Sequence, residues 1–304
     1  MTGAAEPFRR VRFALSKGEM AGIAFGDPAR PVDVLFLHAT GLNARTYRTV
    51  LEPLGAHFHV LAVDLRGHGR SSLPASRFNY TSWRRHRDDV VALIEKHLRT
   101  SVTLAGHSMG ATTSLLVAAH RPQLARGLAL LDPVIAPPGF YAMAQWPLMP
   151  HVWRSTMPIA KNAGRRRADF PSFDAAQAAL TGRGFFKTFP PEALADYVAD
   201  GFVESDGGVT LACRPEWEQA TFAAQRHDPW RALVRAPDPL IILRAEHGST
   251  FRAEKRVVAM RPTARIAMVE GASHAFPLER PDRARAAIET AALSARGKGY
   301  SLVE

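Results

Sequence analysis

Short apolar runs alternate along this chain with longer segments in which apolar residues recur every three or four positions. The runs have the pattern of buried β-strands, and the longer segments have the pattern of amphipathic helices. The strand-like runs are residues 9–16, 19–26, 32–39, 59–65, 102–108, 127–134, 239–245 and 264–271. Because helical segments separate most of these runs, the pattern predicts an α/β protein whose mostly parallel sheet is covered by helices on both faces.

The pattern changes between residues 137 and 235, where prolines and aromatic residues are frequent and short helical segments replace the strands. Strand-like runs stand on both sides of this stretch, so it is predicted to be an insertion that caps one edge of the sheet. The predicted organisation is a core of residues 1–136 and 236–304, with a helical cap or lid of residues 137–235.

The composition and charge of the chain bear on whether it binds nucleic acid. The chain has 304 residues, of which 46% are hydrophobic and 22% are charged, as is typical of a globular protein. Its formal net charge of +11 comes from arginines spread along the sequence, and the cluster Arg165, Arg166 and Arg167 has the pattern of a solvated loop or helix face. Without a recognisable nucleic-acid-binding module, no nucleic-acid partner is expected.

The sequence shows no signal for secretion or for insertion into a membrane. The single cysteine, Cys213, excludes an intrachain disulfide, and nothing argues for an oxidising compartment. The first residues lack the apolar stretch of a secretory signal, and no apolar run has the length of a membrane span. We therefore expect a cytoplasmic protein without stable membrane insertion, and the sequence does not indicate its oligomeric state.

A candidate nucleophile stands in the segment "GHSMG", residues 106–110. The segment follows a strand-like run and opens a helical one, which is the setting in which G-x-S-x-G forms a nucleophile turn. There Ser108 occupies a strained backbone conformation, and the Met109 N–H at the helix N-terminus is a candidate oxyanion donor. The alternative role for Ser108 is a simple helix cap.

A serine hydroxyl is a weak nucleophile at neutral pH and needs a base within hydrogen-bond reach. His274 lies just after the last strand-like run, in a loop that is expected to meet the serine turn at the carboxyl edge of a parallel sheet. It is therefore preferred as the base over His38, His107, His227 and His247.

An acid must orient that base, and a second amide must complete the oxyanion site. Asp132 and Glu246 both end strand-like runs between the serine and the histidine, and both are candidates. The Thr40 N–H, in the loop after the third run, is the candidate second oxyanion donor. This set of groups is the requirement for acyl transfer through a covalent intermediate.

Taken with their order and spacing, four segments resemble the α/β-hydrolase fold superfamily, in particular its capped esterases, lipases and C–C hydrolases. They are "FLHATGLN" (36–43), "DLRGHGRSS" (64–72), "GHSMG" (106–110) and "GASHAFPLERPD" (271–282). The resemblance implies an α/β-hydrolase fold with an eight-stranded, mostly parallel sheet, helices on both faces and a helical cap. It also implies a serine hydrolase mechanism, no cofactor and no metal.

The sequence departs from the family pattern at two positions. Ala39 replaces the glycine of the usual His-Gly-x oxyanion loop, and Gly248 stands where many members carry the triad acid after the seventh strand. Some members carry the acid after the sixth strand instead, where Asp132 lies, so Asp132 is favoured over Glu246. A serine nucleophile disfavours the epoxide hydrolase and haloalkane dehalogenase reactions of this fold, which need a carboxylate.

The sequence thus predicts a carboxylesterase-like serine hydrolase. The aromatic, methionine-containing cap favours a small-molecule ester with an apolar acyl chain or aromatic ring. The alternatives are a C–C bond hydrolase or lactonase of the same fold, and a ligand receptor that does not turn its ligand over.

Overall fold

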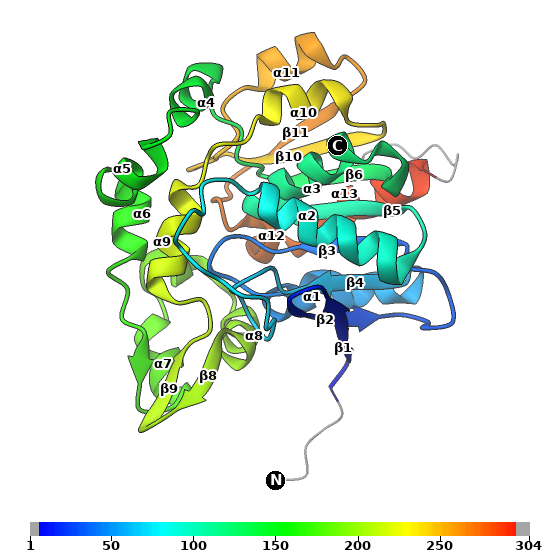
Figure 1. Ribbon diagram of the computed structural model, residues 1–304. Coiled ribbons are helices and arrows are strands. Elements are labelled where there is room, and N and C mark those ends of the chain that lie inside the picture. The colour runs from blue at the N-terminus through cyan, green and yellow to red at the C-terminus, as the bar shows by residue number, and fades with distance from the viewer. Residues whose placement is uncertain (1–5, 296–304) are drawn as a thin grey trace.

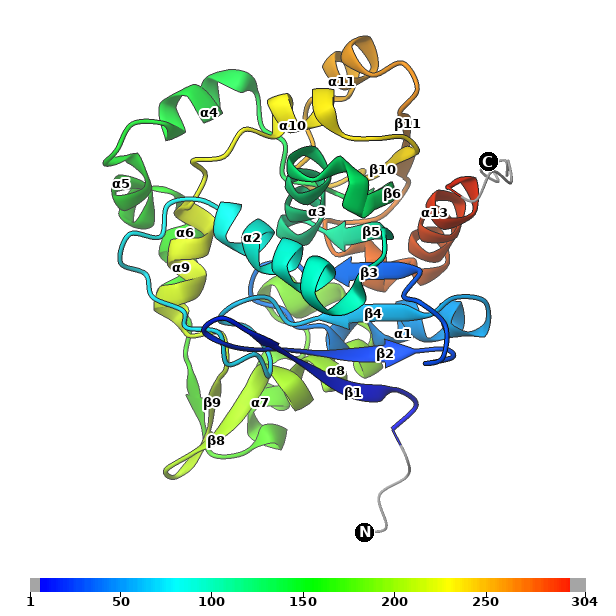
Figure 2. The same cartoon turned by 45° about the vertical axis from the view of Figure 1, so that its right-hand side comes forward.

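The computed structural model describes residues 6–295 (Figures 1 and 2). An eight-stranded sheet with the order β1-β2-β4-β3-β5-β6-β10-β11 forms its centre, and β2 is antiparallel to both of its neighbours while β3 to β6, β10 and β11 run parallel. The strands are β1 (Arg9–Leu15), β2 (Gly18–Phe25), β3 (Val34–Leu37), β4 (Val60–Val63), β5 (Val102–His107), β6 (Ala125–Leu131), β10 (Leu240–Ala245) and β11 (Arg265–Val269). The predicted fold class is confirmed, and each strand overlaps one of the predicted runs.

Side chains of the central strands alternate between two hydrophobic layers, because successive residues of a strand point to opposite faces. In β3, Leu35 and Leu37 pack into one layer and Val34 and Phe36 into the other. The first layer is covered by α2 (Arg84–Leu93), α3 (Met109–His120), α10 (Pro229–Arg235) and α11 (Glu254–Met260), and the second by α1 (Arg48–Leu51), α12 (Phe276–Glu279) and α13 (Pro281–Ser294). Burial on both faces explains why these strands are continuously apolar.

Short helical turns connect these elements. They are η1 (Arg45–Tyr47), η2 (Glu52–Ala56), η3 (Ile94–Leu98) and η4 (Pro122–Leu124). Within residues 6–295 no helix has both the length and the apolar composition to cross a membrane.

The insertion between β6 and β10 lies to one side of the sheet, at the left in Figure 1. It contains α4 (Pro138–Ala144), α5 (Met149–Thr156), α6 (Pro158–Ala163), α7 (Phe173–Leu180), η5 (Gly184–Thr188), α8 (Pro191–Gly201) and α9 (Pro215–Ala223). It also contains a small antiparallel sheet of β7 (Asp169–Phe170), β9 (Gly208–Leu211) and β8 (Phe202–Ser205), which the sequence did not predict. The last helix of the predicted cap segment, α10, packs against α3 of the core.

The core and cap boundaries remain a prediction, and their outermost positions, 1–5 and 296–304, lie outside the described residues. The parallel strands bring the loops after β3, β5, β6 and β11 to one edge of the sheet, beside the insertion. In parallel sheets that carboxyl edge is where ligand sites form.

Candidate active site

The turn between β5 and α3 places Ser108 at this edge in a strained conformation, with φ 54° and ψ −115°. The Ser108 amide donates a 2.9 Å hydrogen bond to the carbonyl of Leu131 on the neighbouring strand, which fixes the turn. Glycines make the turn possible: a Cβ on Gly110 would lie 2.0 Å from the Leu37 carbonyl oxygen, and one on Gly106 would lie 2.6 Å from the Gly110 carbonyl carbon. The sequence GHSMG therefore lets strand and helix approach more closely than any larger residue allows.

His274, in the loop after β11, bridges Ser108 and Asp132. Its Nε2 lies 3.1 Å from Ser108 Oγ, and its Nδ1 lies 2.5 Å from Asp132 Oδ2. Because an ionised carboxylate only accepts hydrogen bonds, Nδ1 carries the proton and donates it to Asp132, which leaves Nε2 to accept from the serine hydroxyl. The structure thus brings these three predicted residues into one hydrogen-bonded chain.

The Asp132 carboxylate is fully buried at the end of β6 and is held by the neighbouring strand end. Oδ1 accepts from the Ala245 amide (3.0 Å) and the Ser249 hydroxyl (2.5 Å), and Oδ2 accepts from the Thr250 amide (3.0 Å). Burial acts to raise the pKa of Asp132, but hydrogen bonds from His274, Ser249 and Thr250 outweigh it and hold the pKa below its usual value. Asp132 is therefore ionised at neutral pH.

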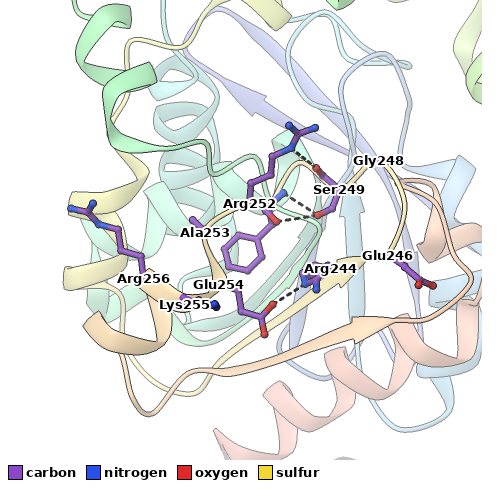
Figure 3. Close-up of a pocket in the computed structure, with 10 residues that line it drawn as sticks. Arg244, Glu246, Gly248, Ser249, Arg252, Ala253, Glu254, Lys255 and Arg256 are labelled. Atoms are coloured by element: carbon purple, nitrogen blue, oxygen red, sulfur yellow. Dashed lines mark hydrogen bonds and ion pairs between the residues drawn. The ribbon is translucent and has the colours of Figure 1, made fainter.

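Glu246, the second candidate acid, is not brought to His274. Its Oε2 accepts a 2.6 Å hydrogen bond from the Gly271 amide, and its side chain is 39% exposed. Glu246 lines a separate hollow of about 640 Å³. Figure 3 shows it there with Arg244, Ser249 and residues of α11. Neither Ser108 nor His274 lines that hollow.

The amides of Thr40 and Met109 both lie next to the catalytic edge, Thr40 in the lining of the cavity beside Ser108 and Met109 directly after Ser108 in the chain. Among residues 6–295, no acceptor is bonded to the amides of Thr40 or Met109. The loop that carries Thr40 is fixed on either side of it: His38 Nδ1 donates to the Ala39 carbonyl (2.8 Å), and the Gly41 amide donates to His68 Nε2 (3.1 Å). Paired free amides held in this way can stabilise a developing oxyanion.

A cavity of about 670 Å³ lies between this edge of the sheet and the insertion. Its apolar wall includes Ile159, Leu180, Phe185, Phe186 and Phe222 from the insertion, and its polar lining includes Asn162, Arg166, Arg183 and Glu218. Sequence reasoning did not find these polar residues. No group of three or more His, Cys, Asp or Glu side chains that could hold a metal occurs in the described part of the chain.

Arg166 and Glu218 form an ion pair at the cavity wall. Arg166 Nη1 donates to Glu218 Oε2 at 2.6 Å and Nη2 donates to the Tyr197 hydroxyl at 3.0 Å. Burial raises the pKa of Glu218 above its usual value, although the Arg166 charge acts against that shift. The sequence-based interpretation of the arginine triplet as a solvated face is thus wrong for Arg166, while Arg165 and Arg167 are exposed.

The sequence of this chain matches the alpha/beta hydrolase family over residues 34–287. The chain belongs to the alpha/beta hydrolase family. The sheet order and the strained serine turn described above agree with that assignment.

Individual relatives of this alpha/beta hydrolase were found by sequence and by structure. It is 26% identical over 246 residues to 2-(acetamidomethylene)succinate hydrolase of Mesorhizobium japonicum, which covers 79% of this chain and 81% of the relative. The crystal structure of E-2-(acetamidomethylene)succinate hydrolase superposes with a TM-score of 0.76 at 25% identity, covering 96% of this chain and all of the other.

A further structure shows the same fold at lower identity. The thioesterase domain from the curacin biosynthetic pathway superposes with a TM-score of 0.75 at 20% identity, over 93% of this chain and 99% of that domain. At that identity the likeness concerns the fold alone.

Proposed function

We propose that this alpha/beta hydrolase cleaves a carboxylic ester by a serine mechanism with an acyl-enzyme intermediate. The observation that carries the proposal is the continuous hydrogen-bonded chain from Ser108 Oγ through His274 to Asp132, beside two unpaired amides and a cavity lined by the insertion. A strained serine at this place has no structural necessity of its own.

In the first half of the reaction, His274 Nε2 removes the Ser108 proton as Oγ attacks the ester carbonyl carbon. The carbonyl oxygen becomes an oxyanion that accepts hydrogen bonds from the Thr40 and Met109 amides. Asp132 stabilises the resulting imidazolium and keeps Nε2 directed at the serine. The tetrahedral intermediate collapses, the C–O bond to the alcohol breaks, and the alcohol leaves with the proton from His274.

In the second half, His274 removes a proton from water as the water oxygen attacks the acyl carbonyl. The second tetrahedral intermediate collapses to the free acid, and Ser108 Oγ takes back the proton from His274. Glu246 has no role in either half, because it contacts neither His274 nor the cavity above Ser108.

The apolar cavity wall favours an apolar acyl chain or aromatic ring as the bound group. Phe185 lies beside the base, with its ring centroid 6.2 Å from that of His274. Hydrolysis of p-nitrophenyl esters of increasing acyl length tests this proposal, with Ser108→Ala as the control. Repeated turnover by the wild type and none by the variant supports it, and at most one turnover on every ester contradicts it.

A second candidate substrate class is an amide that carries a carboxylate. Arg183 lines the cavity and forms no ion pair with any acid in residues 6–295, so its positive charge is available to a carboxylate on a ligand. The name of the Mesorhizobium relative describes a substrate with an acetamido group and two carboxylates. A matched pair of amides, with and without a terminal carboxylate, tests this class: Arg183→Gln should lower kcat/KM for the acid only.

The cytoplasmic location, the absence of a nucleic-acid partner and the lack of a cofactor or metal remain predictions from the sequence.

A further inference from the structure

A second hydrogen-bonded chain runs beneath the catalytic groups. The Ala39 amide donates to the Tyr47 hydroxyl oxygen at 3.2 Å, Tyr47 Oη lies 2.7 Å from His107 Nδ1, and His107 Nε2 lies 2.8 Å from the carbonyl oxygen of His274. It begins one residue before Thr40, on the loop after β3, and ends on the backbone of the catalytic base, after β11. Nothing in the mechanism described above uses Tyr47 or His107.

The chemistry of its two ends fixes the direction of the outer bonds, and the neutral state of the buried His107 fixes the bond between them. A backbone amide can only donate, so Tyr47 Oη accepts from Ala39 and its own proton is free to go to His107 Nδ1. A carbonyl can only accept, so His107 Nε2 must carry a proton and donate it to His274. Each hydrogen bond therefore has one allowed polarity, and His107 must be the neutral Nε2–H tautomer.

Burial keeps both central residues in the required states. Tyr47 and His107 have no exposed surface, and burial together with the nearby His274 lowers the pKa of His107 to about 3. The two rings are also packed in place: Tyr47 lies 4.7 Å from Phe36 between ring centroids, and His107 lies 4.8 Å from His274. The loop that carries Thr40 and the loop that carries His274 are thus both hydrogen-bonded to the packed pair of Tyr47 and His107.

We propose that Tyr47 and His107 are positioning residues that hold the Thr40 amide and the His274 ring in register with Ser108. The proposal rests on the proposed function, because it assigns the pair to the same reacting groups. Small errors in the placement of an oxyanion donor or a base lower the rate of a serine hydrolase strongly, so the pair acts on the rate of attack rather than on substrate binding.

The main test compares Tyr47→Phe with Tyr141→Phe. Tyr141 is also buried, accepts from a backbone amide (Ala136, 3.3 Å) and donates to a backbone carbonyl (Val134, 3.0 Å), but it does not line the cavity. Both variants keep the ring and lose a hydroxyl of similar environment, so they should lose similar stability. The readout is the second-order rate constant for labelling of Ser108 by a fluorophosphonate, followed by peptide mass spectrometry.

We expect Tyr47→Phe to slow the labelling of Ser108 about 10-fold, because it breaks both the hydrogen bond from the Ala39 amide and the hydrogen bond to His107 that tie the two loops together. Tyr141→Phe should label at the wild-type rate once the folded fraction is equal. Equal rates in the two variants would overturn the proposal, because the Tyr47 hydroxyl would then contribute only to stability.

A double-mutant cycle tests whether the two residues act as one unit. In His107→Gln the amide nitrogen can replace Nε2 as the donor to His274, but no ring nitrogen remains at the place of Nδ1 to accept from Tyr47, so the variant breaks the same link as Tyr47→Phe. We expect the double variant to label little more slowly than either single variant. If the fold-losses in labelling rate of the two single variants multiply in the double variant, the coupling is overturned. The comparison of Tyr47→Phe with Tyr141→Phe still tests the proposal if a His107 variant does not fold.

The labelling assay separates this proposal from the proposed function. A wild type that labels at Ser108 but hydrolyses no ester contradicts the esterase reaction, and the Tyr47→Phe rate still decides the role of the pair. A wild type that hydrolyses esters with no difference between the tyrosine variants overturns only the positioning role. A wild-type Ser108 that does not react at all would contradict both.

Discussion

Replacing Asp132 with asparagine should disable the enzyme and destabilise the fold together. Each carboxylate oxygen of Asp132 accepts from one backbone amide, Oδ1 from Ala245 and Oδ2 from Thr250. An asparagine has a single carbonyl oxygen, so in either orientation its NH₂ group faces a backbone N–H. Asp132→Asn therefore has no orientation in which every buried donor is paired.

The expected losses of stability and of kcat have separate causes. One unsatisfied buried donor costs about 1–3 kcal/mol of unfolding free energy. With NH₂ at the Oδ2 position, His274 must turn Nδ1 into an acceptor, which places the proton on Nε2 and removes the base from Ser108 Oγ. Loss of the correct tautomer in a triad lowers kcat by about 10⁴-fold.

The assay measures kcat and KM on one p-nitrophenyl ester and urea unfolding at the same pH. Glu246→Gln is the matched control, since it removes a carboxylate at the neighbouring strand end that is 39% exposed, accepts from the Gly271 amide and lies 3.8 Å from His247 Nε2. We expect the control to keep kcat within about threefold of the wild type, as for a surface substitution. Asp132→Asn with more than a tenth of the wild-type kcat, or an equal loss in the control, would refute the assignment.

Two further predictions concern the stability of the loops that hold the catalytic residues. Gly110→Ala should lower the thermal midpoint of unfolding sharply or prevent folding, because the new Cβ would lie 2.0 Å from the Leu37 carbonyl oxygen. The control Gly139→Ala, whose Cβ would meet open space, should leave the midpoint unchanged. Equal melting curves for the two variants would contradict this. Burial lowers the pKa of His68 from 6.5 to about 4, so the folded protein binds fewer protons than the unfolded chain between those values and stability is lost as the pH falls through them. His68 alone should cost about 2 kcal/mol by pH 5 in urea titrations, and an unfolding free energy that does not change between pH 8 and pH 5 would show that the buried histidine is not held neutral.

The strands and the serine turn were predictable because their causes are local. A strand that is buried on both faces must be continuously apolar, and a turn that brings a helix against a strand end needs glycine at its contact positions. Both features are written in adjacent residues, in "VLFL" of β3 and in Gly106 and Gly110 around Ser108. His274 could be placed because it follows the last strand at the same sheet edge.

The residues alone leave both acids open, and Asp132 is favoured only through the resemblance to the family. Asp132 and Glu246 both follow strands that are neighbours in the sheet, β6 and β10. Their side-chain directions depend on backbone conformation, such as the positive φ of 45° at Asp132, and on donors from Ser249 and Thr250. The loop after β10, which carries Glu246, supplies hydrogen bonds from Ser249 and Thr250 to Asp132.

The polar cavity lining was missed because its partners come from distant parts of the chain. Arg166 and Glu218 are separated by 52 positions, and neither stands in a motif. The small sheet of the insertion was missed because its strands have only two to four residues, which is too short for a periodic pattern. Long-range packing decides both features.

Trapping of the acyl-enzyme tests the central claim most directly. Wild-type protein is mixed with a p-nitrophenyl ester, quenched in acid within the first turnovers and digested for mass spectrometry, with Ser108→Ala treated in parallel. The account predicts that the peptide containing Ser108 gains the mass of the acyl group and that the variant gains none. Steady release of p-nitrophenol by the wild type with the acyl group on another residue, or continued turnover by Ser108→Ala, would contradict it.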